Sequence, residues 1–198
     1  MAFVLVGLGN PGKEYEKTRH NAGRLVIEVF RKEHNFPEFV FNKTANALVS
    51  EGRLGKEKIV LVLPETMMNK SGVSVAKYVK SVKAAKQLLV IHDELDIPLP
   101  HMKMVFGRNS GGHKGVESIM RSIKTKNFAR LRLGISGAAR KNQAKKPQGE
   151  ERVVKHVIGK WKPTEEKEVK KMIKKGVHVA ELFIEESIEA ATQVANTR

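Results

Sequence analysis

Apolar residues along the chain form two patterns, short continuous runs and positions repeated at helical intervals. Short runs between polar residues predict buried strands, and apolar positions repeated every three or four residues predict amphipathic helices. The runs predict strands at 3–6, 39–49, 58–63, 88–91, 101–106 and 129–135. The helical spacing predicts helices at 21–33, at a segment carrying Val75, Val79 and Val82, at a segment carrying Ile119, Met120 and Ile123, and beyond Pro163. Strands alternating with helices predict an α/β fold, with helices on both faces of a mixed sheet.

Caps, loops and chain length complete this outline. Asn69 or Ser71 is expected to cap the helix that carries Val75, and Thr164 is expected to cap the helix after Pro163. Residues 137–149 are polar and basic, and we expect them to form a mobile loop. A length of 198 residues fits one domain. We therefore expect a single domain over residues 1–198, with a helical region at about 164–197.

Composition removes several classes of protein. The chain has no Cys, which excludes disulfide scaffolds, thiolate metal sites and cysteine nucleophiles. Its apolar runs are far shorter than the roughly 18 residues that a membrane-spanning helix requires. No targeting segment is visible before the first predicted strand. We expect a cytoplasmic protein that does not enter a membrane and that acts as a monomer.

Positive charge is concentrated in one part of the chain. The net charge is +16, and residues 101–175 hold 21 Lys and Arg against 6 Asp and Glu. The strand predicted at 129–135 is basic on one face through Arg130 and Arg132. A segregated positive field of this kind is typical of proteins that bind a polyanion such as nucleic acid. The alternative is a lysine-rich surface that serves solubility.

A glycine-rich turn, GLGNPG at 7–12, follows the first predicted strand. Its glycines match the spacing of dinucleotide-binding loops, in which glycine allows the close approach of a pyrophosphate. No apolar helix follows the turn directly, and the acidic residue expected about 20 positions on would lie in a helix instead of at a strand end. We interpret the segment as a tight loop that presents Asn10, with a nicotinamide or flavin site as the alternative.

Two further segments carry titratable side chains at expected element boundaries. His20 lies in TRHN at 18–21 before a predicted helix, and Asp93 lies in HDELD at 92–96 after a buried strand. Ligands of α/β proteins bind beyond such strand ends, so His20 is a candidate general base and Asp93 a candidate to orient it. The alternatives are helix capping by His20, a solvated turn at 92–96, and a divalent metal held by its carboxylates.

Polar loops precede two of the predicted helices. Asn69 lies in MMNKSG at 67–72, and His113 lies in NSGGHKG at 109–115. Amide and imidazole groups in such loops hydrogen-bond a substrate or a developing oxyanion, although a helix cap or a packed side chain also fits each residue. The chain has neither Cys nor a Gly-x-Ser-x-Gly elbow. A base, an orienting carboxylate and neutral donors without a nucleophile favour hydrolysis by activated water.

Taken together, these segments resemble a known family. The matching segments are GLGNPG at 7–12, Tyr15, TRHNAG at 18–23, MN at 68–69 followed by Ser71 and Gly72, HDELD at 92–96, GGHKG at 111–115 and FARLRLGI at 128–135. In this order and spacing, across about residues 3–160, they are similar to the bacterial-type peptidyl-tRNA hydrolases. The resemblance implies an α/β enzyme that cleaves the ester between a peptide and the 3′ ribose of tRNA, without a metal or another cofactor.

The resemblance also implies a role for each candidate residue. His20 would activate water as a general base, Asp93 would orient and polarise His20, and Asn10 would position the reacting ester. The peptide channel would be lined by Met68, Asn69 and His113, with Asn69 contacting the peptide backbone. The full set implied to bind substrate is Tyr15, Met68, Asn69, His113 and Lys114.

Two positions depart from the family pattern. Lys114 stands where the family usually has an asparagine that helps to bind substrate and stabilise the intermediate. The family's basic clamp for the tRNA 5′ phosphate is matched by Arg132, but Val105 occupies the position of its usual lysine, so Lys103 or Arg108 is expected to substitute. Lys114 is the best support for an alternative function, that of a non-catalytic RNA-binding relative; a dinucleotide oxidoreductase is the third interpretation.

Overall fold

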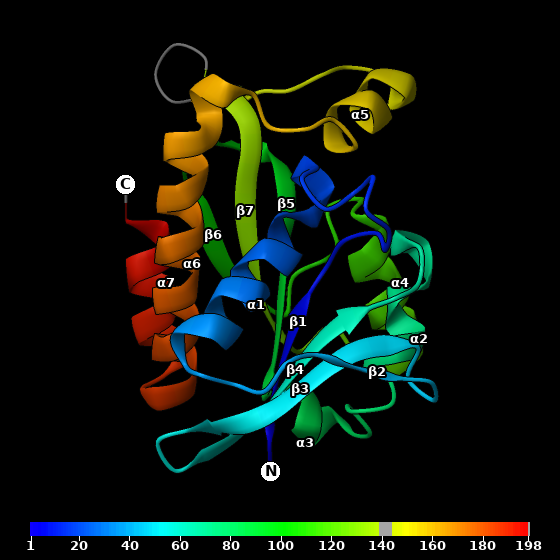
Figure 1. The fold of residues 1–198 in the computed structure, drawn as a ribbon, viewed down its shortest axis with the longest axis vertical. Coiled ribbons are helices and arrows are strands. Elements are labelled where there is room, and N and C mark those ends of the chain that lie inside the picture. The colour runs from blue at the N-terminus through cyan, green and yellow to red at the C-terminus, as the bar shows by residue number, and fades with distance from the viewer. Residues whose placement is uncertain (139–143, 198) are drawn as a thin grey trace.

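The strands form one mixed sheet, as the sequence predicts (Figure 1). The structure is a computed structural model and describes residues 1–138 and 144–197. Its strands are β1 Phe3–Gly7, β2 Val40–Asn42, β3 Ala47–Leu54, β4 Glu57–Pro64, β5 Leu88–Pro98, β6 Met102–Phe106, β7 Ala129–Ala138 and β8 Ala144–Lys145. They lie in the order β2-β3-β4-β1-β5-β7-β6, with β8 paired to β7. The neighbours β4, β1, β5 and β7 are parallel, whereas the pairs β2–β3, β3–β4, β6–β7 and β7–β8 are antiparallel.

Helices cover both faces of this sheet, which confirms the predicted fold class (Figure 1). The α-helices are α1 Ala22–Glu33, α2 Ser71–Val75, α3 Val82–Ala85, α4 Lys114–Ile123, α5 Glu150–Val157, α6 Glu166–Glu185 and α7 Ile188–Asn196; the 3-10 helices are η1 Arg19–Asn21, η2 Met68–Lys70 and η4 Pro163–Glu165. Leu5 of β1 packs in a core with α1, α6 and α7, while its neighbours Val4 and Val6 pack in a second core with α2 and α4. The two-residue period of a strand thus places alternate side chains in separate cores.

Two predicted elements in the first half of the chain are wrong. The single strand expected at 39–49 is the hairpin of β2 and β3, because Asn46 adopts a left-handed conformation (φ 47°) that turns the chain. The helix expected through Val75 and Val82 is the separate pair α2 and α3. Val82 is 53% exposed, and the Oγ of Ser81 accepts the N–H of Ala84 to begin α3. Asn69 caps neither helix.

The second half also differs from the outline. β5 continues through 92–96 as far as Pro98, so these residues form neither a strand end nor a turn. Part of the expected loop at 137–149 is the antiparallel pairing of β7 with β8, and residues 139–143 lie outside the described residues. α5 was not predicted, because five of its eight residues are polar or charged and none of the eight is buried. Thr164 is not a cap: it lies within η4, whose N-cap is Lys162, and the carboxylate of Glu165 accepts the N–H of Lys162 at 2.7 Å.

The start of α1 packs directly on the sheet. A Cβ on Gly23 would lie 2.1 Å from the carbonyl oxygen of Ile91 on β5, so only glycine allows this approach. The same oxygen accepts the N–H of Leu8 at 3.0 Å, which joins the end of β1 to β5. Through these contacts, the start of α1 and the ends of β1 and β5 come together. None of the helices in the described ranges has the length and apolar character needed to cross a membrane.

Candidate active site

Asp93 lies at the centre of a cluster of three side chains from separate elements. It lies on β5, and only 3% of the residue is exposed. Its Oδ1 accepts hydrogen bonds from Nδ1 of His20 at 2.9 Å and from Nε2 of His113 at 3.0 Å. The structure therefore brings together three candidate residues that are far apart in the sequence.

His20 lies on η1, which is tied to the chain that leads into α6. The Nη1 group of Arg19 donates to the carbonyl oxygen of Lys160 at 2.6 Å, and its Nη2 pairs with Glu165 at 2.7 Å. The same guanidinium lies 5.0 Å from the ring centre of Trp161. The His20 side chain is 16% exposed, and its Nε2 has no hydrogen-bond partner among the described residues. His20 is not a helix cap, so one nitrogen is fixed and the other is open.

His113 is both a helix cap and a member of the cluster. As the N-cap of α4, its Nδ1 accepts the N–H of Val116 at 3.4 Å. Because Nδ1 acts as an acceptor, the ring proton lies on Nε2, which donates it to Asp93. The ring of His92 packs edge-on against His113, with the ring centres 4.5 Å apart. Capping and membership of the site are therefore compatible at this position.

Burial and charge oppose each other within the cluster. Burial alone would raise the pKa of the Asp93 carboxyl, but the charges and hydrogen bonds of His20 and His113 outweigh it and hold that pKa far below its usual range. Burial alone would lower the pKa of His20, but the charge and hydrogen bond of Asp93 raise it above the ordinary 6.5. Asp93 is therefore ionised at neutral pH. With its Nδ1–H donated to Asp93, His20 has Nε2 as its basic nitrogen.

Asn21 fixes the glycine-rich turn that carries Asn10. Its Oδ1 accepts the N–H of Asn10 at 2.9 Å, and its Nδ2 donates to the Asn10 carbonyl oxygen at 3.0 Å. The Oδ1 of Asn10 in turn accepts the N–H of Met68 at 2.9 Å. These bonds occupy the backbone and side-chain oxygen of Asn10 and leave its Nδ2 group. The turn leads into η1 instead of a phosphate-binding helix, so the dinucleotide interpretation finds no support.

A cavity of about 340 Å³ opens beside the cluster. The candidate residues that line it are His20, Met68, Asp93, His113 and Lys114. α5 adds an apolar wall of Val153, Val154 and Val157. This wall was not predicted from the sequence, although the spacing of its three valines is that of one helix face.

The other candidate substrate-binding residues lie outside this cavity or at its edge. Asn69 is exposed on η2, beside the lining residue Met68, and Tyr15 is half-buried in the turn before η1. The Lys114 side chain is 68% exposed, and its ammonium lies 3.7 Å from the carboxylate of Glu150 on α5. An ion pair this exposed contributes little to stability. Lys114 therefore lies on the rim and is not part of the Asp93 cluster.

Two of the candidate basic residues face each other across neighbouring strands. Lys103 on β6 is directly opposite Arg132 on β7, so their side chains share one face of the sheet. Lys103 is exposed, and Arg132 pairs through Nε and Nη2 with Glu94, each at 2.8 Å. Arg108 is also exposed but lies in the chain after β6. Arg130 is 2% exposed, so the expectation that it adds to a basic face is wrong.

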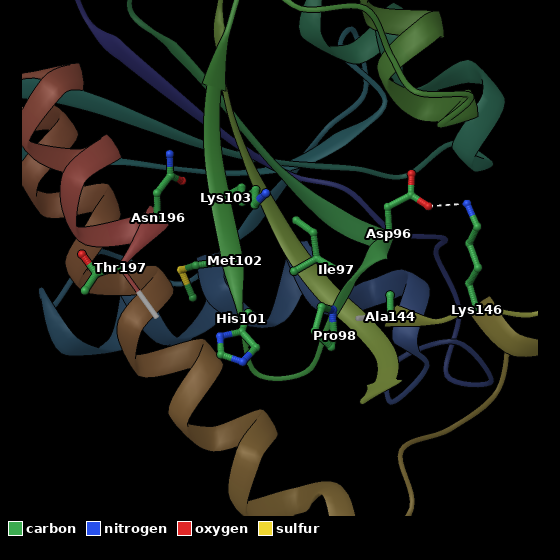
Figure 2. Close-up of a pocket in the computed structure, with 10 residues that line it drawn as sticks. All are labelled: Asp96, Ile97, Pro98, His101, Met102, Lys103, Ala144, Lys146, Asn196 and Thr197. Atoms are coloured by element: carbon green, nitrogen blue, oxygen red, sulfur yellow. Dashed lines mark hydrogen bonds and ion pairs between the residues drawn. The ribbon is translucent and has the colours of Figure 1, made fainter. Parts of the chain in front are cut away.

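A larger cavity of about 670 Å³ lies next to the first, and Figure 2 shows the residues around it. Asp96 and Lys146 line both cavities and form an ion pair with a distance of 2.5 Å. Lys146 lies on one side of the larger cavity, and Asn196 and Thr197 lie on the opposite side. Lys103 also lines it. The larger cavity thus has two lysines in its wall and none of the three residues of the cluster.

The cluster is also the one group in the described parts of the chain whose donor atoms are close enough for a shared metal ion. The donor atoms of His20, Asp93 and His113 lie within 4.8 Å of one another. The two N···O distances are those of direct N–H···O hydrogen bonds, so the three residues form a complete hydrogen-bond network by themselves. Glu94 and Asp96, the other carboxylates considered for a metal, instead form ion pairs with basic side chains.

The fold and the cluster define a class of protein. An ionised, buried carboxylate that orients a histidine beside a cavity is the arrangement of a hydrolase that activates water. A family model described as peptidyl-tRNA hydrolase matches residues 4–198. The chain belongs to the peptidyl-tRNA hydrolase family.

Individual relatives agree with this assignment. The chain is 41% identical over 198 residues to the peptidyl-tRNA hydrolase of Aquifex aeolicus, a match that covers 98% of this chain and 95% of that protein. It is 39% identical over 189 residues to that of Methylacidiphilum infernorum, covering 95% and 94% of the two chains. The crystal structure of peptidyl-tRNA hydrolase from Acinetobacter baumannii matches with a TM-score of 0.87 and 31% identity, over 99% of this chain and 95% of that one.

Proposed function

We propose that the protein hydrolyses peptidyl-tRNA at the ester between the peptide and the 3′ ribose, using water activated by His20. The observation that carries this proposal is the shared Oδ1 of Asp93. It fixes Nδ1 of His20 at 2.9 Å and leaves Nε2 without a partner among the described residues, beside a cavity of about 340 Å³. Membership of the family supports the choice of substrate.

The reaction follows from this arrangement. A water molecule gives one proton to Nε2 of His20 while its oxygen bonds to the ester carbonyl carbon. The ionised Asp93 stabilises the imidazolium that forms, because the two groups share a hydrogen bond. When the tetrahedral intermediate collapses, the bond from the carbonyl carbon to the 3′ oxygen breaks. The proton on His20 then passes to that oxygen, which leaves free tRNA. The peptide leaves with a new carboxyl group, which releases the second proton of the water to solvent and becomes a carboxylate.

We assign stabilisation of the developing oxyanion to the start of α4 beside the cavity and to Asn10, whose side chain lies outside the cavity lining. The positive end of the α4 dipole follows directly after His113. The Nδ2 group of Asn10 remains for the substrate, because its Oδ1 is bonded to Met68. Met68 and the valines of α5 form an apolar wall for a peptide side chain, and Lys114 lies at the rim. We assign contact with the peptide backbone to Asn69 and a further substrate contact to Tyr15.

The tRNA is proposed to bind along the basic side of the protein. Lys103 and Arg132 share one face, and Lys103 lines the larger cavity beside the active-site cavity. Exposed cations such as Lys103 contact the phosphate groups of tRNA independently of sequence. Arg132, which is partly exposed and paired with Glu94, adds a second cation beside it. Arg108 is exposed farther along the same edge and serves as an additional contact. We propose that the protein acts as a monomer, since one chain supplies every residue of the cluster. We also propose that it acts in the cytoplasm, because its proposed substrate is a product of translation.

The release of an N-blocked amino acid from its tRNA tests this function. We expect wild-type protein to release it, and His20→Ala to lose about 10²- to 10⁴-fold in kcat/KM, the usual contribution of a general base. His178→Ala is the matched control, because His178 also pairs with a carboxylate but is 57% exposed on α6. That variant should retain wild-type activity.

The same assay separates hydrolysis from RNA binding alone. Binding of tRNA to wild type and to His20→Ala is measured in parallel, and we expect similar affinities. If wild type binds tRNA but releases no more product than His20→Ala, the protein is an RNA-binding relative and the proposed reaction is wrong.

A further inference from the structure

Arg130 and Arg132 lie two positions apart on β7 but have different surroundings. Arg132 is partly exposed and pairs with Glu94. Arg130 is 2% exposed, and its Nη2 donates to the carbonyl oxygens of Arg108 at 3.2 Å and Asn109 at 2.7 Å. Its Nη1 lies 3.4 Å from Nε2 of His92. The guanidinium of Arg130 is therefore directed into the protein, toward the chain that leads to His113.

His92 connects this guanidinium to the cluster. It is fully buried, and its Nδ1 donates to the carbonyl oxygen of Asp93 at 2.7 Å. Nε2 is therefore the acceptor that faces Arg130. Burial, followed by the charges of His113 and Arg130, lowers the pKa of His92 well below its usual value, so the ring is neutral. Its edge-on contact with His113 completes a continuous path from Arg130 to the cluster.

We propose that Arg130 is a positioning residue, which holds His92 and residues 108–109 so that His113 stays hydrogen-bonded to Asp93. This inference rests on the proposed function and adds a residue to its machinery. The chain from Arg108 leads directly into the loop that carries His113, so its anchorage at two carbonyl oxygens fixes one side of that loop. The edge-on contact with the His92 ring restricts the orientation of the His113 ring. Arg130 acts through these neighbours and does not touch the substrate.

The electrostatics of Arg130 support a specific role for a guanidinium. Burial, and then the charge of Arg132, lowers the pKa of Arg130 to about 10. Within the described ranges, no carboxylate forms an ion pair with it, and its partners are two carbonyl oxygens and an imidazole nitrogen. Burying a cation without a paired anion lowers the stability of the folded protein, and an apolar residue in place of buried charge is often as stable or more so. Stability alone therefore does not explain an arginine at position 130. The planar fork reaches several acceptors in fixed directions, which a lysine ammonium does not do.

The two arginines provide a matched pair of variants. We expect Arg130→Gln to lower kcat by about ten- to hundredfold, because a small displacement of catalytic groups has effects of this size. Its KM and the salt dependence of tRNA binding should be unchanged. Arg132→Gln should do the reverse: kcat stays close to wild type, KM rises, and the slope of log affinity against log salt falls by about 0.7 to 0.9 for one lost phosphate contact.

Non-additivity tests whether Arg130 acts through His113. In a His113→Ala background, Arg130→Gln should cause little further loss of kcat, since the group that it positions is already absent. The ¹⁵N NMR signals of the imidazoles give a readout independent of turnover: the His113 tautomer with its proton on Nε2 should dominate in wild type and be lost in Arg130→Gln. Additive losses, or an unchanged His113 signal, overturn the proposal.

Charge, fork geometry and folding are separated by a second variant. Arg130→Lys keeps the buried charge, and we expect it to leave kcat lowered; full recovery of kcat would show that charge alone is needed and overturn the role of the fork. Thermal unfolding identifies any variant that is unfolded at the assay temperature, in which case the assay is read at a lower temperature. The wild-type comparison with His20→Ala is made first, so failure of the proposed reaction is distinguished from failure of this inference.

Discussion

The cluster of His20, Asp93 and His113 differs in burial and in contacts from the basic rim beside it, by which we mean Lys103 and Lys114. In the cluster, the carboxylate is almost fully buried and every distance to its partners is set by a hydrogen bond of about 3 Å. On the rim, Lys103 and Lys114 are exposed and Lys114 has one weak ion pair. Rigid, desolvated groups suit the chemical step, whereas mobile, solvated cations suit attraction of a polyanion. We therefore expect changes in the cluster to affect kcat, a change of Lys103 to affect tRNA affinity, and a change of Lys114, which lines the active-site cavity, to have a small effect on kcat/KM.

Of the variants that test this difference, Asp93→Asn should have the largest effect, a loss of kcat. An amide retains the shape of the carboxylate but neither stabilises the His20 imidazolium nor accepts from both histidines in the same way. We expect kcat to fall by about 10²- to 10⁴-fold, with tRNA affinity close to that of wild type. Single-turnover release and equilibrium tRNA binding measure the two quantities. A main loss in affinity would show that the cluster and the rim are not separate.

The pH profile refines the interpretation of the cluster. Because His20 must be neutral to accept a proton, kcat/KM should rise with pH as His20 deprotonates. Asp93 raises the pKa of His20, so the wild-type midpoint should lie above 6.5. In Asp93→Asn, the burial of His20 remains and the raising charge is lost, so the residual activity should have its midpoint at lower pH. A midpoint that does not move would remove Asp93 as the group that tunes His20.

Lys103→Gln tests the rim. Loss of one phosphate contact should weaken tRNA binding by about fivefold at moderate salt and lower the salt slope by about 0.7 to 0.9. kcat should be unchanged, because Lys103 does not line the active-site cavity. The measurement is affinity for tRNA at several salt concentrations, with Lys58→Gln on β4 as the control lysine. Equal effects of both substitutions would indicate general charge instead of a site.

Lys114→Asn should have the smallest effect. Its ammonium is directed toward Glu150 and solvent, whereas an amide at this position is able to hydrogen-bond the substrate. We expect kcat/KM to increase by about twofold, the low end of the roughly 0.5–1.5 kcal/mol of one net hydrogen bond. Release kinetics of the variant and wild type give the comparison. A decrease of tenfold or more would place Lys114 among the groups that contact the reacting ester.

Parts of the fold were predictable because local pattern and burial agree. The strand at 3–6 and the helix at 21–33 have unambiguous apolar periods, and both are present. The hairpin of β2 and β3 was not predicted, because apolar residues lie on both sides of the short turn at 43–46, which ends at the left-handed residue Asn46. α5 was missed because none of its residues is fully buried and charged residues dominate its pattern. Its three valines line the cavity, and Val157 also packs against the edge of the core.

The site was predictable residue by residue, but its contacts were not. His20, Asp93 and His113 were each identified as candidates, whereas their convergence on one oxygen depends on the packing of η1, β5 and α4. Arg130 shows most clearly what the sequence pattern does not predict, namely which of two alternating residues is buried. Its position on β7 gives it the same alternation as Arg132, and the sequence contains no signal that one is buried and the other exposed.

The contact between Gly23 and Ile91 limits how the active site varies. His20 lies just before Gly23 on one segment, and Asp93 lies just after Ile91 on the other, so the distance between the two backbones determines whether the two side chains meet. A side chain at Gly23 would force these backbones apart, although Gly23 has no reacting atom. The distance between His20 and Asp93 therefore depends on how closely Gly23 packs on Ile91, and this approach requires the hydrogen atom that only glycine has in place of Cβ.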